Sequence, residues 1–200
     1  ATGKTSRQDM VLILSSLFAF AAVHNNDRVG ATFFSENIEK WVPPKKGKKQ
    51  VFRLVEDFRS MPLQSRGSDL AHAVRTVYES IKRRGICIII SAFRANPSWR
   101  ELSLLAKKHD GIAVKITDPS EKVFPLSGLA ELVDPETGST LHAAGSLPKF
   151  RRRYREFWNS HHLLWERECL RRGVAPLSIS TNDDPVMCLL RFFERWSLRR

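Results

Sequence analysis

Residues 84–94 read R-G-I-C-I-I-I-S-A-F-R, an apolar run that passes into a polar loop. Five consecutive β-formers, residues 86–90, lie between charged segments of helical character, which is typical of a central parallel strand buried on both faces. In sheets of this kind the working groups lie just past the carboxyl ends of the strands. The chain offers Ser91, Ala92 and Phe93 there, so this strand delivers one hydroxyl group and no charge.

Helix and strand patterns alternate along the rest of the chain. Apolar residues at helical spacing, with stop signals such as Gly173, predict helices over residues 5–24, 48–61, 69–83, 98–108 and 148–172 and a last helix after Pro185. Strands are predicted over 28–34, 38–42 (ending at Pro43), 86–90, 111–117 and 176–180, with a hairpin of 129–133 and 140–143. Ser98 and Glu101 form a predicted capping box at the start of one helix. The alternation predicts an α/β fold with a mainly parallel sheet and helices on both faces.

The length of 200 residues, with 42% hydrophobic residues, predicts one domain over residues 1–200. We expect a core over 1–145 and a helix-strand-helix extension over 146–200. The longest apolar helix candidate, residues 11–23, is too short for a bilayer that needs about 20 residues. Three cysteines without a CxxC pair, one of them inside the apolar strand, predict free thiols in a reducing compartment. Because the chain begins at Ala1, we expect it to be part of a longer protein.

The net charge of +12 favours acidic partners, whether nucleic acid, anionic lipid or an acidic protein surface. Two basic segments stand out: Lys45, Lys46, Lys48 and Lys49 in a Pro-Gly loop, and Arg151, Arg152 and Arg153 at the start of the long helix, where Phe150 and Tyr154 are interleaved. That mixture suits phosphate contacts and base stacking. It equally suits the solvated face of a helix or a headgroup surface, so the sequence leaves these interpretations open.

Six short phrases occur in a particular order along the chain: N-D-R-V-G (26–30), P-P-K-K-G-K-K (43–49), R-G-S-D-L (66–70), R-R-G-I-C-I-I-I-S-A-F (83–93), K-K-H-D-G-I-A-V-K-I-T-D-P (107–119) and L-V-D-P-E-T-G (132–138). Each phrase alone is weak, but their order and spacing together are specific. In this respect the chain resembles one bacterial family, the domain of unknown function DUF58. The resemblance implies a Rossmann-like von Willebrand factor A fold with a metal-ion-dependent adhesion site at the carboxyl edge of its sheet.

In such a site, an Asp-x-Ser-x-Ser loop, a threonine and an aspartate hold Mg²⁺, a cation that requires several oxygen ligands. By resemblance, Ser68 occupies the threonine position and Ala92 the aspartate position, and the Asp-x-Ser-x-Ser loop would precede Ala1. A methyl group cannot bind a cation, so we expect a degenerate site in which Ser68 is a remnant, with Mg²⁺ bound only if upstream residues restore the site. Without that role, Ser68 and Asp69 are explained as a capping hydroxyl and a first-turn acid of a helix.

The resemblance also implies that the first, central strand of the sheet is missing from this chain. We therefore expect the strand near residue 28 and the strand near residue 86 to flank a gap, or a strand from elsewhere, and not to pair directly.

The predicted function is non-enzymatic protein-protein interaction through Ser68, Asp69, Ser91, Ala92 and Phe93. By resemblance, the expected partner is a MoxR-type AAA+ ATPase, in a chaperone-like or assembly role. The expected location is the cytoplasm or, through an upstream anchor, the cytoplasmic face of a membrane. The alternatives are a nucleic-acid-binding module that uses the basic face and, with less support, a phosphate-handling enzyme.

Overall fold

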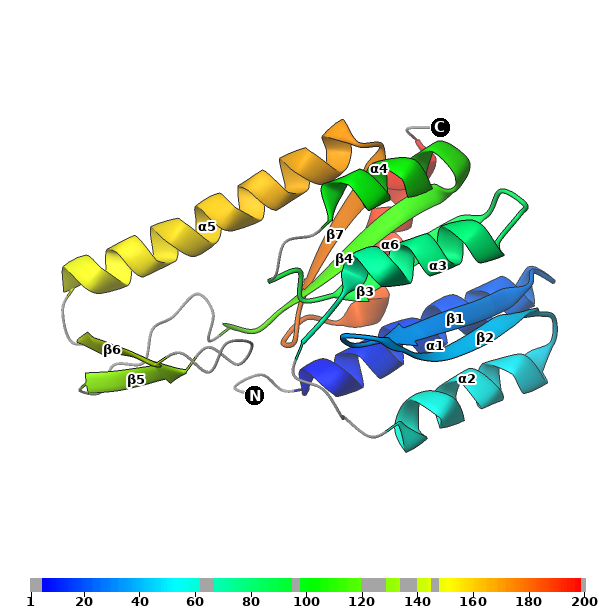
Figure 1. Ribbon diagram of the computed structural model, residues 1–200, viewed down its shortest axis with the longest axis horizontal. Helices are drawn as coiled ribbons and strands as arrows, with labels where there is room; N and C mark the ends of the chain where they lie inside the picture. Colours follow the sequence, from blue (N-terminus) through cyan, green and yellow to red (C-terminus); the bar gives the residue numbers. More distant parts are fainter. Residues whose placement is uncertain are drawn as a thin grey trace.

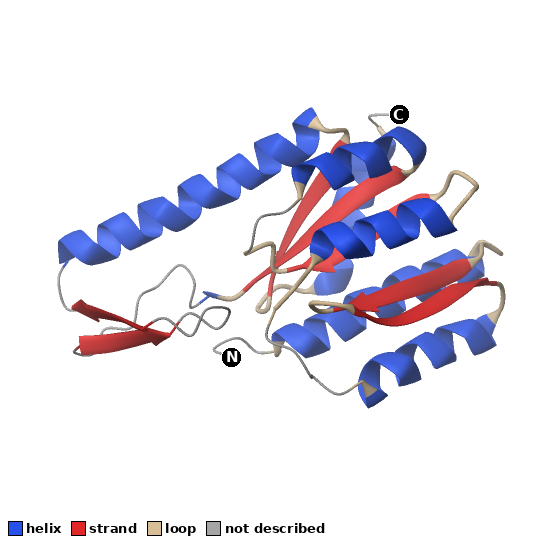
Figure 2. Ribbon diagram, viewed as in Figure 1, coloured by secondary structure: helices blue, strands red, loops and turns tan. Residues whose placement is uncertain are grey.

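A computed structural model describes residues 5–61, 67–94, 98–119, 129–133, 140–144 and 148–198. Its centre is a three-stranded parallel sheet in the order β3-β4-β7, formed by Ile86–Ser91, Asp110–Thr117 and Val174–Ser180. The sheet lies between helices on both faces (Figures 1 and 2). The predicted α/β fold with a parallel sheet is therefore confirmed.

Each face of the sheet has its own hydrophobic core. On one face α3 (Leu70–Ser80), α4 (Trp99–Lys108) and α5 (Pro148–Arg171) cover the sheet, and Trp165 and Cys169 of α5 are fully buried there. On the other face α1 (Arg7–His24) and α6 (Pro185–Ser197) pack against Ile112, Val114 and Ile116 of β4. Successive residues of β4 thus serve opposite cores, as the alternation of side chains along a strand requires.

The C-terminal segment is an integral part of this architecture. β7 pairs with β4 along its whole length, and Leu189 and Phe192 of α6 complete the second core. The long helix α5 ends where Gly173 takes a positive φ of 75°, as its sequence predicted. β7 and α6, which lie in the predicted helix-strand-helix extension, therefore contribute a strand to the sheet and side chains to its second core.

A second, two-stranded sheet pairs β1 (Val29–Phe34) with β2 (Ile38–Lys45) in antiparallel fashion. The predicted end of β2 at Pro43 is wrong, because the strand continues through Pro43 and Pro44. Proline is tolerated there because β2 is an edge strand and the ladder has an irregularity opposite, between Val29 and Ala31. Gly30 lies in that irregularity, where a Cβ atom would be 2.6 Å from the carbonyl oxygen of Val42.

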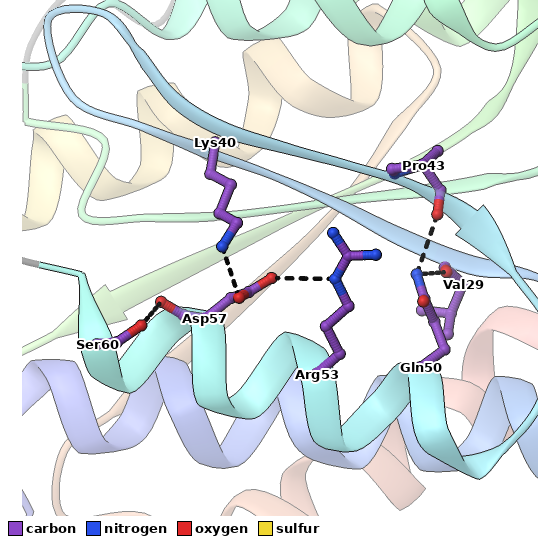
Figure 3. Close-up of polar contacts among 7 residues, drawn as sticks. All are labelled: Val29, Lys40, Pro43, Gln50, Arg53, Asp57 and Ser60. Carbon is purple, nitrogen blue, oxygen red and sulfur yellow. Dashed lines mark hydrogen bonds and ion pairs between the residues drawn. The ribbon is translucent and has the colours of Figure 1, made fainter.

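Helix α2 (Lys48–Ser60) covers the two-stranded sheet and is bound to it by polar contacts (Figure 3). The buried side-chain amide of Gln50 donates to the carbonyl oxygens of Val29 at 3.1 Å and Pro43 at 3.0 Å. About two turns further along α2, Asp57 accepts a hydrogen bond of 2.6 Å from Lys40 Nζ of β2. The amide therefore donates to one carbonyl of each strand beside the irregular part of the ladder, where Pro43 and Pro44 have no N–H group.

The two sheets are not joined by strand pairing, since β1 and β3 belong to different sheets. The prediction that these two strands do not pair directly is confirmed. The prediction that β3 is a central strand is wrong: β3 lies at an edge, and Ile86 is 55% exposed. Its two faces are covered as predicted, because Ile89 belongs to one core and Ile88 and Ile90 pack against the other. The central strand is β4, because it alone of the three has a hydrogen-bonded neighbour on each side.

Helix starts follow the expected chemistry at two places and depart from it at a third. Ser6 caps α1 by accepting from the backbone N–H of Asp9 at 3.0 Å, and Asp184 caps α6. The predicted capping box of α4 is wrong, because Ser98 has a left-handed backbone with a φ of 49° and makes no side-chain cap. Glu101 instead forms an ion pair of 2.7 Å with Arg75 of α3, which also holds the pKa of its carboxyl group below the ordinary value.

The remaining predictions concern the hairpin and the thiols. β5 (Leu129–Val133) and β6 (Thr140–Ala144) pair in antiparallel fashion as predicted, and the loop between them lies outside the described residues. Cys87, Cys169 and Cys188 are free thiols, as expected. Burial raises the pKa of both Cys87 and Cys169 to about 12. Among the helices in the described part of the chain, none is both long and apolar enough to cross a bilayer.

Candidate functional site

The carboxyl ends of the three parallel strands meet at one edge of the sheet, at Ser91 of β3, Thr117 of β4 and Ser180 of β7. Thr117 and Ser180 are partners in register, and the backbone N–H of Thr181 donates to the carbonyl of Thr117 at 3.0 Å. Open α/β proteins place their working groups at this edge. We call it the carboxyl edge.

The loop that follows β3 is held in place by a turn and an aromatic contact. Phe93 has a left-handed backbone with a φ of 47°, and its N–H donates to Ser91 Oγ at 3.3 Å. Its ring is 3% exposed and lies 5.4 Å from that of Trp165. The prediction that Phe93 contacts a partner is therefore wrong, because its side chain is part of the core. Ser91 and Ala92 are half-buried and remain at the edge.

The start of α3 brings Ser68 and Asp69 to the same region. Leu70, directly after Asp69, and Phe93, directly after Ala92, belong to one hydrophobic cluster, so the two loops pack onto the same core. Asp69 is the N-cap of α3, and its carboxylate accepts from the backbone N–H of His72 at 2.9 Å. The predicted cap by the Ser68 hydroxyl is thus wrong, because Asp69 occupies that position and leaves Ser68 exposed and outside the helix.

Three buried polar residues at the carboxyl edge were missed by the sequence reading: Lys115, Asp118 and Thr181. Lys115 is 3% exposed, pairs in register with Ser91 and Ser178, and places its Nζ 3.5 Å from His161 Nδ1 and 5.3 Å from the centre of the Trp165 ring. Its contacts link β4 to α5. A lysine inside the apolar run G-I-A-V-K-I was the available signal, because lysine is rarely buried without a specific partner.

The described residues that correspond to the adhesion site do not by themselves fit a magnesium ion. The positions that resemble adhesion-site ligands supply one exposed hydroxyl, from Ser68, and a methyl group, from Ala92. The nearby carboxylate of Asp69 is occupied by capping α3, and Ser91 has a buried lysine as its register partner. Within the described ranges, no three His, Cys, Asp or Glu side chains are grouped as a metal site would require. The arrangement is suited to hydrogen bonding and surface contact.

The basic residues do not form one face. Lys45, Lys46, Lys48 and Lys49 are exposed at the junction of β2 and α2, whereas Arg152 and Arg153 are exposed near the start of α5. These two places lie at opposite ends of the longest axis (Figure 1). Arg151 is half-buried, and Phe150 lies outside the residues whose side chains the structure describes. The described residues of the two basic segments therefore do not form one continuous surface for nucleic acid.

The fold and the residues of the carboxyl edge define the class of this protein, which is an α/β protein with a Rossmann-like parallel sheet and a polar carboxyl edge. The chain belongs to the DUF58 family, described as a protein of unknown function, whose model matches residues 1–163. An uncharacterized protein of Mycobacterium tuberculosis is 25% identical over 194 residues, covering 96% of this chain and 61% of the relative. An uncharacterized protein of Mycobacterium avium is 33% identical over 103 residues, which is 50% of this chain and 60% of that protein. This chain thus spans about three fifths of the length of these relatives.

A solved structure has a similar fold. The crystal structure of the conserved hypothetical protein BatB from Bacteroides thetaiotaomicron matches with a TM-score of 0.60 and 13% identity, covering 98% of this chain and 90% of that chain. At this identity the likeness concerns the fold alone.

Proposed function

We propose that this chain is a von Willebrand factor A-like interaction domain with a degenerate adhesion site, which binds a protein partner through the carboxyl edge and catalyses no reaction. One observation carries the proposal: the loops after β3 and before α3 pack onto the same hydrophobic core near the carboxyl edge, and they present the hydroxyl group of Ser68 and the methyl group of Ala92 where a metal-bearing domain would present a threonine and an aspartate. A partner would contact Ser68, Asp69, Ser91 and Ala92 through hydrogen bonds and surface shape, with no cation between them.

The separation of β1 from β3 supports the same class. The von Willebrand A topology has a strand between these two, and the apolar β3 has an edge that pairs with neither β1 nor β2. In the whole protein, an upstream segment would supply that strand. A magnesium ion would bind only if the same segment also brought an Asp-x-Ser-x-Ser loop.

The family resemblance suggests a MoxR-type AAA+ ATPase as the partner, in a chaperone-like or assembly role at the cytoplasm or the cytoplasmic face of a membrane. We rank nucleic acid below a protein partner, because the two basic clusters lie at opposite ends of the molecule.

The test uses the full-length protein and its cognate MoxR-type ATPase in isothermal titration calorimetry. A Ser68→Arg substitution adds a bulky charge at the exposed start of α3, and Ser80→Arg adds the same group at the exposed end of the same helix. We expect complex formation by the unaltered protein, at least tenfold weaker binding for S68R, and unchanged binding for S80R. No complex with the unaltered protein, or equal binding by both variants, would overturn the proposal.

A further inference from the structure

The end of the molecule away from the carboxyl edge carries an apolar pocket. The pocket lies between the end of α1 and the start of α2 and has a volume of about 390 Å³. Its walls come from Phe20, Ala21, Val23 and His24 of α1 and from Lys48 of α2. No part of the proposed function uses this place.

Large aromatic side chains are exposed beside the pocket. Phe20 is 45% exposed and Phe52, one turn along α2, is 62% exposed, and their rings meet edge to face with centres 6.2 Å apart. An exposed phenylalanine side chain lacks the free energy that burial of its apolar surface would provide. Two such side chains beside a pocket are therefore suited to contact with a ligand. The pocket could therefore bind an apolar side chain.

Positively charged residues lie next to this apolar pocket. The segment K-K-G-K-K, residues 45–49, contains no acid, and all four lysines are exposed. None of the four forms an ion pair with another residue in the described part of the chain. The N-terminus of α2 starts in the same segment, at Gly47, without a side-chain cap, which adds partial positive charge. Together these groups complement a negatively charged ligand that also has an apolar side chain.

We propose that this surface, formed by the pocket, Phe20, Phe52 and the four lysines, binds an acidic peptide segment that inserts one aromatic or large aliphatic side chain. The apolar side chain would enter the pocket beside Phe20, and acidic residues on either side of it would face Lys45, Lys46, Lys48 and Lys49. A pocket that can hold one side chain favours a peptide ligand over a bilayer, because a bilayer presents a broad surface and no single side chain that could enter the pocket. Charge complementarity brings partners together quickly, and the buried anchor sets how long they remain bound.

The test is fluorescence anisotropy with a labelled peptide in which one phenylalanine is flanked by glutamates. Two matched peptides, one with alanine for phenylalanine and one with glutamine for each glutamate, separate the apolar from the charged contribution. We expect the first peptide to bind the 200-residue chain and both controls to bind at least tenfold more weakly. Binding should also weaken as salt is added, because exposed charges are screened.

Variants of the protein locate the site. F52A removes an exposed ring, and the double variant K48E/K49E reverses exposed charge, so neither should disturb the core. We expect each to weaken peptide binding at least tenfold. The control R152E/R153E reverses two exposed arginines at the far end of the molecule and should leave binding unchanged. Binding that is insensitive to F52A and K48E/K49E would overturn the proposal. So would affinity for phosphatidylserine vesicles combined with no affinity for the acidic peptide, which would identify the surface as a membrane contact.

Discussion

The side-chain amide of Gln50 donates a hydrogen bond of 3.1 Å to the carbonyl oxygen of Val29, and the same nitrogen reaches Pro43 (Figure 3). This contact lies where the ladder between β1 and β2 is irregular, and the helix side chain donates to one carbonyl of each strand there. The arrangement makes α2 a structural part of the hairpin.

We expect Gln50→Leu to lower the free energy of unfolding by about 1–3 kcal/mol, because it removes two part-buried hydrogen bonds from the buried Gln50 side chain to the hairpin. Gln50→Glu should also destabilise, since an ionised carboxylate cannot donate. Urea unfolding followed by circular dichroism measures both. Lys49→Ala, at an exposed neighbour on the same helix, is the control and should change stability by less than about 0.5 kcal/mol. A stability of Q50L equal to that of the unaltered chain would show that water replaces the amide without cost.

Gly30 is predicted to tolerate no side chain. A Cβ atom there would lie 2.6 Å from Val42 O and 2.8 Å from Pro44 N, both backbone atoms that cannot rotate away. We expect Gly30→Ala to lower the free energy of unfolding by more than about 1 kcal/mol. Gly85→Ala is the matched control, because a Cβ atom at Gly85 meets nothing within 4 Å. Equal melting temperatures for G30A and G85A would contradict this account of the hairpin.

The buried imidazole of His109 should make stability depend on pH. Burial, with a smaller contribution from Lys108, lowers the pKa of His109 below its ordinary value of 6.5. The unfolded chain therefore binds more protons than the folded chain as the pH falls below about 6.5, and folding stability decreases in that direction. Urea midpoints measured at several pH values between neutrality and mild acid test this. In His109→Gln the dependence should be weaker, and an unchanged slope would assign it to other groups.

The open edge of β3 should be visible in hydrogen exchange. In a parallel ladder a strand with one neighbour leaves alternate N–H groups unbonded to the sheet, whereas β4 is bonded on both sides. We expect the fastest amides of β3 to exchange at least roughly tenfold faster than those of β4. NMR-detected exchange on the 200-residue chain measures this. Equal protection of all amides in the two strands would show that β3 is covered, and in that case the edge would not be open.

Local sequence patterns predicted most of the elements but not the neighbours of each strand. The run in β3 is apolar enough for a central strand, yet only the pairing partners decide whether it is one, and periodicity does not encode them. The role of Gln50 could not be predicted from its own segment, because it depends on carbonyls 7 and 21 residues away. The capping box at Ser98 failed for a similar reason: Glu101 has a better partner in Arg75, 26 residues earlier.

The candidate site was predicted in part. The carboxyl end of β3 could be placed from the strand itself, and Ser68 and Asp69 came with the family resemblance. The burial of Phe93 could not be foreseen, since it depends on Trp165 from a helix far along the chain. The same helix explains Lys115, whose ammonium group lies beside His161.

The division of the strands into two sheets also has a consequence for the order of folding. The hairpin of β1 and β2 closes a short loop, whereas β3, β4 and β7 must be assembled across long stretches of chain, from residue 86 to residue 180. Contacts between residues near in sequence form faster than distant ones, because less chain entropy is lost before they are made. We therefore expect the hairpin with α2 to gain structure first, and the joining of β7 to β4 to limit the overall rate.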